Sequence, residues 1–225
     1  MIYSALKYYL ISSPKILFDM EFYKIPFLII NKPQVINIRG GFKFYINNLI
    51  DVWTLKEIIL DRQYEKLFRV DGGEVIDIGA GLGDFSILAS KKAEKVLAFE
   101  CDKKRFMLMN KNLQANHISK VSGFMEKVSS LDELFKKYKV RNCDFLKIDC
   151  EGAEYKIFQS ASRNTLSKIK KIAFEIHIFK KNDYEKYLEL KRKLKRNNFL
   201  LKEIANPVHT NLCYLFAQRS AFFEN

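Results

Sequence analysis

The stretch Glu74-Val-Ile-Asp-Ile-Gly-Ala-Gly-Leu-Gly-Asp-Phe-Ser-Ile-Leu88 decides the fold. Its mostly apolar start, 75–78, predicts a buried strand, and the apolar spacing over 85–88 predicts the start of a helix. Between them stand glycines at positions 79, 81 and 83. Glycine permits a tight turn and lets a ligand lie against the backbone, and the following helix offers free N–H groups to a polar ligand. A strand, a glycine turn and a helix form the first unit of a nucleotide-binding α/β domain.

The glycine spacing narrows the class of ligand. Dinucleotide-binding enzymes typically show G-x-G-x-x-G, whereas this chain has G-x-G-x-G preceded by an acid in the strand. This pattern resembles motif I of the S-adenosylmethionine (SAM) methyltransferases of Rossmann-like fold, whose ligand has a charged amino-acid moiety and no phosphate. A glycine-rich turn without a ligand is the alternative. The candidate cofactor contacts in this stretch are Asp77, Gly79, Ala80, Gly81 and Gly83.

An acid follows the next predicted strand. Glu100 ends the apolar run 96–99, about 20 residues beyond the glycines, where an acid contacts the ribose of a nucleotide. A carboxylate suits two ribose hydroxyls because it offers two acceptor oxygens. Asp102 is expected to assist it. The simpler interpretation of Glu100 is a solvated acid at a strand end.

Predicted strands and helices alternate from residue 74 onward. Strands are expected at 75–78, 95–100, 121–125, 144–149, 169–176, 199–204 and 212–217, and helices at 84–92, 103–116, 131–138, 153–160 and 183–197. This alternation predicts an α/β fold of Rossmann-like, class I methyltransferase type, with a mostly parallel seven-stranded sheet covered by helices. A short turn between the last two strands predicts an antiparallel edge.

The residues before this domain are expected to form a small extension. A helix over 1–11 is predicted to end at Pro14, a hairpin is predicted at 34–39 and 42–47, and a helix capped by Asp51 is predicted over 52–68. We therefore divide the chain into an N-terminal helical and hairpin extension, residues 1–70, and a SAM-binding methyltransferase domain, residues 71–225.

A second informative stretch is Asp144-Phe-Leu-Lys-Ile-Asp-Cys-Glu-Gly-Ala-Glu154. Here an apolar strand ends in Asp149 and Glu151, and Lys147 is expected to pair with one of these two acids. The next strand ends in Glu175 and His177, whose side chains share one face because they are two residues apart. Since the carboxyl ends of parallel strands line the ligand crevice, all four residues are candidates for the active site.

These stretches resemble a known family. The motifs 145–154 and Phe174-Glu-Ile-His177, with Leu131-Asp132, the lead-in 48–53 and Tyr64, are similar to the FkbM family of SAM-dependent methyltransferases over roughly residues 45–180. The resemblance implies methylation of a hydroxyl on a small molecule, sugar or lipid-linked glycan. It implies SAM contacts at the three glycines and Glu100, and it places the four acid and histidine candidates at the active-site rim. Met125 is expected beside the adenine, although the segment 121–131 is shorter than the family pattern.

His177 is the candidate general base. An attacking hydroxyl must lose its proton, and a histidine with a pKa near 6.5 can accept it. Glu175, Asp149 or Glu151 would orient the imidazole or replace it as base. Positioning of the acceptor oxygen in line with the methyl carbon is a further contribution. A histidine held only for structural reasons is the alternative.

The net charge is +13 and the sequence pI is about 9.5, which favours anionic partners. The basic helix predicted at 183–197 is either a solvated face or a patch that faces an anion. An RNA methyltransferase is therefore the alternative function. The sequence Asp149-Cys-Glu-Gly152 opposes it, because enzymes that methylate exocyclic base nitrogens usually carry Asp/Asn-Pro-Pro-aromatic there. A non-catalytic SAM-binding or interaction module is a third hypothesis.

Cysteine use and the N-terminus predict a cytoplasmic protein. The four cysteines form no C-x-x-C pair, and with no third and fourth ligand at sensible spacing we expect reduced thiols and no metal site. The longest apolar run, 25–30, is far shorter than the roughly 20 residues that span a bilayer. Peripheral membrane contact is an alternative to core packing for one apolar set, namely Ile2, Tyr3, Leu6, Tyr9 and Leu10.

Overall fold

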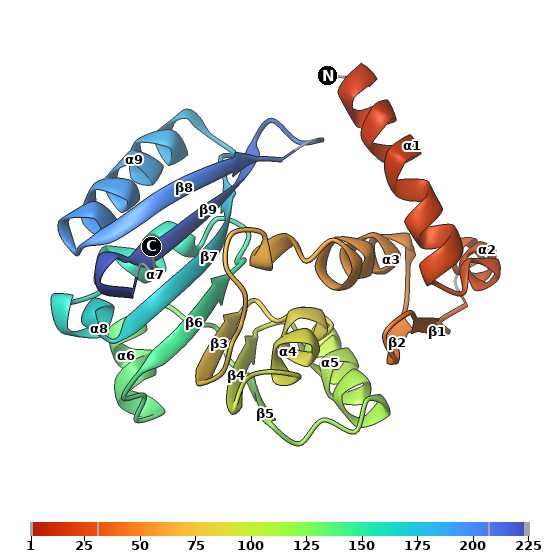
Figure 1. Ribbon diagram of the computed structural model, residues 1–225, viewed down its shortest axis with the longest axis horizontal. Helices are drawn as coiled ribbons and strands as arrows, with labels where there is room; N and C mark the ends of the chain where they lie inside the picture. The colour runs from red at the N-terminus through yellow and green to blue at the C-terminus, as the bar shows by residue number, and fades with distance from the viewer. Residues whose placement is uncertain (1, 31, 207, 223–225) are drawn as a thin grey trace.

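A seven-stranded sheet forms the centre of the computed structural model, which describes residues 2–30, 32–206 and 208–222 (Figure 1). Its strand order is β5-β4-β3-β6-β7-β9-β8. The strands are β3 (Glu74–Ile78), β4 (Lys95–Glu100), β5 (Val121–Met125), β6 (Cys143–Ile148), β7 (Ile169–His177), β8 (Phe199–Ala205) and β9 (Leu212–Arg219). The first five pair in parallel, whereas β9 runs antiparallel to β7 and β8. The mostly parallel seven-stranded sheet with an antiparallel edge that the sequence predicts is confirmed.

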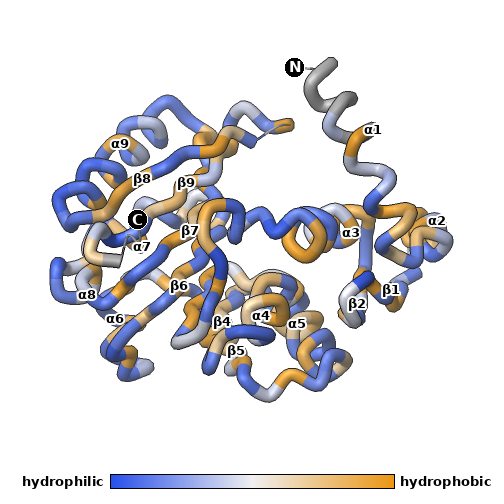
Figure 2. The backbone as a smooth tube through the Cα atoms, viewed as in Figure 1, coloured by the Kyte–Doolittle hydropathy of each residue, from blue (hydrophilic) through white to orange (hydrophobic). Residues whose placement is uncertain are grey.

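Helices cover both faces of this sheet because its central strands are apolar on both sides (Figure 1). Val75 of β3 packs into the core beneath α4 (Asp84–Ser90) and α5 (Lys103–Ala115). Ile76 and Ile78 face the opposite core. The helices of that second layer are α6 (Leu131–Lys137), α7 (Glu154–Gln159), α8 (Arg163–Ser167) and α9 (Lys181–Arg196). Figure 2 shows the largely hydrophilic course of α9, which buries only a stripe that includes Leu190 and Leu194.

The N-terminal segment differs from the sequence prediction in its helices. Helix α1 (Ile2–Asp19) continues through Pro14 instead of ending there, and its later residue Ile16 packs against the core. Helix α3 (Leu49–Leu55) is capped by the side chain of Asn48, not by Asp51. It then widens into a π-helical turn, Lys56–Leu60, and a 3₁₀ segment, Gln63–Glu65, so the predicted single helix over 52–68 is wrong.

The hairpin is where the sequence placed it, as β1 (Gln34–Ile38) and β2 (Phe42–Ile46). It lies against α5, where Oδ1 of Asn112 accepts a hydrogen bond from the Tyr45 N–H at 2.7 Å. One apolar core includes residues from both sides of position 70, such as Phe44 and Val75. The division at residue 70 stays a prediction, but the extension is packed onto the sheet domain through this shared core.

The segment from α1 to α2 (Ile25–Ile29) exposes several large apolar side chains. They are Ile11, Leu17, Phe18, Phe22, Tyr23, Phe27, Ile29 and Ile30. The five side chains that the sequence proposed for membrane contact lie outside the described side chains. Within the described ranges, no helix has the length and apolar character required to cross a bilayer.

Candidate active site

The glycine turn after β3 is built by close packing on one side and open space on the other. A Cβ on Gly79 would lie 1.7 Å from the carbonyl oxygen of Asp149, so only glycine lets the ends of β3 and β6 approach this closely. A Cβ on Gly81 would meet only Oδ2 of Asp84, at 3.8 Å. Both glycines have positive φ, at 79° and 57°. Gly83 also has a positive φ and stands at the N-terminal cap of α4.

A cavity of about 380 Å³ opens beside this turn, a size in the range of small-molecule sites. Its wall contains the predicted cofactor residues Gly79, Gly81 and Glu100 together with Asp149 and Glu151. Ile50, Thr54 and Ile58 add an apolar side from the N-terminal segment. Which residues of this segment line the cavity depends on how α3 packs, so the sequence alone does not identify them. Glycines facing open space beside a carboxylate fit the amino-acid and ribose groups of SAM.

Glu100 is held by backbone donors. Its Oε2 accepts a hydrogen bond from the Gly81 N–H at 2.8 Å, and its Oε1 accepts one from the Asp102 N–H at 2.7 Å. Each carboxylate oxygen has a second lone pair, so both remain able to accept ribose hydroxyls. The contact between Glu100 and Gly81 also fixes the carboxylate to the glycine turn.

The other predicted cofactor residues lie around the cavity and do not form its wall. Asp102 caps α5, accepting a hydrogen bond from the Arg105 N–H at 2.8 Å. Met125 is exposed at the end of β5, and Ala80 is buried, with its N–H bonded to the Phe99 carbonyl at 2.9 Å. We therefore give Asp102, Ala80 and Gly83 a role in shaping the turn and the helix ends, and Met125 stays a predicted contact.

Asp77 and Lys147 form a buried pair beneath the glycine turn. The Lys147 Nζ lies 3.1 Å from Oδ1 of Asp77 and donates to the Gly79 carbonyl at 2.6 Å. The Ser86 hydroxyl donates to Oδ2 of Asp77 at 2.6 Å. The expectation that Lys147 pairs with Asp149 or Glu151 is wrong, since Asp77 lies directly across the parallel register from Lys147. This pair holds the turn in place from below.

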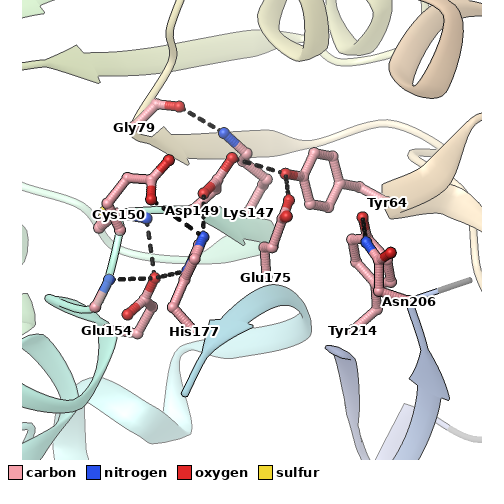
Figure 3. Close-up of polar contacts among 12 residues, drawn as sticks. Tyr64, Gly79, Lys147, Asp149, Cys150, Glu154, Glu175, His177, Asn206 and Tyr214 are labelled. Atoms are coloured by element: carbon pink, nitrogen blue, oxygen red, sulfur yellow. Dashed lines mark hydrogen bonds and ion pairs between the residues drawn. The ribbon is translucent and has the colours of Figure 1, made fainter. Parts of the chain in front are cut away.

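Tyr64 joins two of the candidate acids, as Figure 3 shows. Its hydroxyl lies 2.9 Å from Oδ2 of Asp149 and 2.8 Å from Oε2 of Glu175. A hydroxyl has one proton, so it can donate to only one carboxylate and must accept from the other acid. Burial, and then the charge of Asp149, raises the pKa of Glu175 to about 8. At neutral pH a protonated Glu175 therefore donates to Tyr64, and Tyr64 donates to Asp149.

His177 is buried between acids (Figure 3). Its Nδ1 lies 2.9 Å from Oε1 of Glu154, a hydrogen-bond distance. Its Nε2 faces Oε2 of Glu151 at 3.5 Å and Oδ1 of Asp149 at 3.9 Å. Burial alone would lower the pKa of His177, but the hydrogen bond to Glu154 and the charges of the neighbouring acids raise it to about 9. The imidazole is thus cationic at neutral pH.

Glu154 is a site residue that sequence reasoning missed. Besides His177, its Oε1 accepts hydrogen bonds from the N–H groups of Cys150 and Gly152, at 3.1 and 3.2 Å. These contacts fix the loop that follows β6, in which Glu151 adopts a left-handed φ of 51°. Left-handed backbone in a non-glycine residue is strained and frequent at functional sites. Glu154 stands in the motif 144–154, which is the only sign of it in the sequence. What Glu154 contacts is seen only in the fold.

Comparisons with known proteins agree with this architecture. Residues 110–201 match the family model of the Methyltransferase FkbM domain. A comparison with curated protein sequences finds no match. SMU.1697c of Streptococcus mutans, solved in complex with SAH, is 14% identical with a TM-score of 0.56, over 72% of this chain and 96% of that one.

Two further structures have the same fold. An rRNA methylase from Streptococcus thermophilus is 12% identical with a TM-score of 0.53, over 72% of this chain and 94% of that one. A structure from Klebsiella pneumoniae, assigned as an O-methyltransferase, is 13% identical with a TM-score of 0.53, over 75% of this chain and 80% of that one. At such identities the likeness shows the fold alone.

The fold is that of the class I methyltransferases, which confirms the fold class predicted from the sequence. The family match over residues 110–201 then confirms the resemblance to the FkbM methyltransferases seen in the sequence. The protein is a SAM-dependent methyltransferase.

Proposed function

We propose that the protein methylates a hydroxyl on a sugar or lipid-linked glycan. The observation that carries this proposal is that Asp149 and Glu151 share one cavity wall with the glycine turn and Glu100. The donor pocket and the cluster of acids are therefore adjacent. SAM, when bound, supplies a methyl group on a sulfonium sulfur that leaves with the electron pair of the broken S–C bond. The chain has to hold the acceptor oxygen in line and receive its proton.

We assign to Asp149 the role of accepting the proton of the acceptor hydroxyl. Its Oδ2 is engaged by Tyr64, which leaves Oδ1 on the side of the cluster that His177 and Glu151 face. The sequence hypothesis made His177 the base, but an imidazole with a pKa of about 9 already carries its proton at neutral pH. His177 is better suited to stabilise negative charge on the acceptor oxygen and on Asp149. Glu175, with its raised pKa, donates through Tyr64 and orients Asp149.

A second cavity supports an anionic group on the acceptor. This cavity, of about 790 Å³, lies between α7 and α9. Its wall contains five basic side chains: Lys156, Lys186, Arg192, Lys193 and Arg196. Gly152 also lines it, while Asp149 and Glu151 line the smaller cavity, so the loop after β6 borders both. A phosphate or other anion of the acceptor could lie in this basic groove while a hydroxyl reaches the loop.

Exposed apolar side chains support the lipid-linked form of the acceptor. Phe18 is 84% exposed and Ile29 68% exposed, on neighbouring helices of the N-terminal segment. Single exposed apolar residues need no explanation, but a group of them is typical of a surface that meets a protein or a membrane. Together with the net charge of +13, this favours contact with an anionic lipid surface. RNA is the alternative anionic acceptor.

Transfer of labelled methyl from SAM to fractionated cell extract tests the proposal. We expect label in the polysaccharide or lipid fraction. Label found only in RNA would favour the alternative function. Failure of the protein to bind either SAM or its demethylated product in calorimetry would contradict both enzyme functions. A His177→Ala variant that keeps full turnover would remove His177 from the reaction.

A further inference from the structure

Three side chains beside the cavity are arranged as ligands of a metal ion. Asp149, Glu151 and His177 each offer one ligand atom, and these atoms all lie within 4.8 Å of one another. They come from the ends of β6 and β7 and from the loop between, which the sheet topology brings to one edge. The sequence predicts no metal site because the cysteine spacing offers no ligand set, whereas this set forms only where the ends of β6 and β7 meet.

The separations fit a shared ion better than they fit hydrogen bonds. The Nε2 of His177 is 3.5 Å from Oε2 of Glu151 and 3.9 Å from Oδ1 of Asp149. Within the described part of the chain, Nε2 makes no hydrogen bond. Two atoms that each lie about 2.1 Å from one ion are about 3.0 Å apart at a right angle and about 4.2 Å apart when opposite. Both separations fall within this interval.

The histidine is also held as metal-binding histidines are. Its side chain is only 5% exposed, and its Nδ1 is bonded to a carboxylate of Glu154 that is 0% exposed. A second carboxylate on the far ring nitrogen fixes the orientation of a ligating imidazole and directs the other nitrogen to the ion. The buried Nε2 faces two carboxylate oxygens at ion-pair distance without a hydrogen bond to either, which is the arrangement expected around a shared ion.

We propose that Asp149, Glu151 and His177 bind a divalent transition-metal ion beside the SAM cavity. Carboxylates suit Mn²⁺, and imidazole suits the later ions up to Zn²⁺, so a mixed set favours this group over Mg²⁺ or Ca²⁺. Glu151 is 80% exposed, which leaves coordination positions open to an acceptor or to water. Binding displaces the proton on Nε2, as it does for any histidine ligand.

The role of this ion rests on the proposed function. The ion would hold the acceptor hydroxyl. An oxygen bound to a divalent ion loses its proton more easily. The hydroxyl proton would pass to a water molecule at the exposed rim, and the oxygen would form its bond to the methyl carbon as the S–C bond of SAM breaks and the sulfur keeps the electron pair. With the ion bound, Asp149 and His177 are its ligands and the proton passes to water; the roles of Asp149 as base and of His177 as cation belong to the protein without the ion.

Binding of Mn²⁺ to the full chain, freed of metal with EDTA, tests the inference without an activity assay. Loss of the paramagnetic signal of free Mn²⁺ should reveal one site per chain. Glu151→Gln changes an exposed side chain and should fold normally, and we expect it to weaken Mn²⁺ binding about 10- to 100-fold. Asp149→Asn should do the same. Glu94→Gln is the matched control, because this exposed acid lies just before β4 at the opposite end of the strand.

Two results would overturn the inference. One is that the unaltered chain binds no Mn²⁺ at millimolar concentration. The other is that Glu151→Gln and Asp149→Asn bind Mn²⁺ as tightly as the Glu94→Gln control. Binding of S-adenosylhomocysteine, measured alongside, separates the two proposals. A chain that binds S-adenosylhomocysteine but no Mn²⁺ would keep the proposed function and contradict the metal site. A chain that binds Mn²⁺ but no S-adenosylhomocysteine would keep the metal site and contradict the proposed function.

Discussion

The carbonyl oxygen of Asp149 stands 1.7 Å from the position that a Cβ on Gly79 would occupy. The N–H of Asp149 also donates to the Ile78 carbonyl at 3.0 Å, so the ends of β3 and β6 are joined backbone to backbone. This contact sets the distance between the glycine turn and the loop that follows β6. A side chain at Gly79, or a shift of the Asp149 backbone, would therefore move the glycine turn and the loop after β6 together.

Gly79→Ala should therefore mainly lower stability, whereas Gly81→Ala should mainly weaken ligand binding. Both introduce a side chain at positive φ, which costs about 1–2 kcal/mol. Only the first also collides with backbone. We expect Gly79→Ala to lower the free energy of unfolding in urea by at least about 2 kcal/mol more than Gly81→Ala does. Gly81→Ala should fold and bind S-adenosylhomocysteine weakly, because its methyl group enters the cavity. Equal loss of stability in the two variants would contradict the close approach.

Glu100→Gln should weaken binding of S-adenosylhomocysteine by roughly 10- to 100-fold. One amide oxygen would replace two carboxylate oxygens that both face backbone N–H donors, and a mismatched buried group costs about 1–3 kcal/mol. Asp102→Asn is the control, since asparagine caps a helix as well as aspartate does. Calorimetry should show a change of less than about threefold for this control. If Asp102→Asn weakens binding as much as Glu100→Gln, Asp102 contacts the ligand directly.

Tyr64→Phe isolates the bridge between the two acids. Loss of the hydroxyl leaves Asp149 without its donor and frees Glu175, while the ring still packs against Phe85. Turnover of the acceptor identified by labelling should fall about 10- to 100-fold, consistent with the loss of a positioning contact. Affinity for S-adenosylhomocysteine should change little, because Tyr64 is not part of the cavity wall. Unchanged turnover would show that the bridge has no role in the reaction.

Much of this arrangement could be predicted because it is local. The run Val75 to Ile78 predicts a buried strand, and the five parallel strands were placed within a residue or two at each end. The glycine spacing and the acid at the end of the next strand are also local signals, and they predict the cavity beside the glycine turn. The contacts of Tyr64 could not be predicted, since it lies 85 residues before Asp149 in the chain and meets it only where the 3₁₀ segment Gln63–Glu65 packs against β7.

The partners of charged residues were the weakest part of the prediction. Lys147 and Asp149 are near neighbours in sequence, yet Lys147 pairs with Asp77 on the adjacent strand. Strand register, not sequence distance, decides which charges meet in a parallel sheet. The course of α1 through Pro14 has a similar cause, because packing of Ile16 outweighs the one backbone bond that proline removes.

Asp84 should make stability depend on pH. Burial raises the pKa of this carboxyl from 3.8 to about 7 in the folded state, although Lys147 opposes the shift. Below about pH 4 both states are protonated, and above it the unfolded chain releases its proton first. The folded state is therefore penalised increasingly as the pH rises from about 4 to about 7, and the penalty is constant above that.

Asp84→Asn removes this ionisation while keeping an oxygen for the Phe85 N–H, which Asp84 accepts at 2.6 Å. Urea unfolding at pH 5 and pH 8 should show the variant gaining stability relative to the unaltered chain at the higher pH. Parallel profiles would mean that Asp84 titrates normally in the folded state.

The basic groove can be tested by reversing charge in two places. Arg192 and Arg196 are four residues apart on α9 and line the larger cavity, so Arg192→Glu with Arg196→Glu places two acids in that groove. Lys91→Glu with Lys92→Glu changes the net charge by the same amount at exposed positions after α4. If an anion of the acceptor lies in the groove, the first pair should raise KM for the acceptor at least about tenfold at low salt, since like charges that face each other cost several kcal/mol. The second pair should raise KM by less than about twofold, because exposed charges away from the contact are screened. Affinity for S-adenosylhomocysteine should be unchanged in both variants. Equal effects of the two pairs would indicate that the net charge attracts the acceptor and that the groove has no specific role.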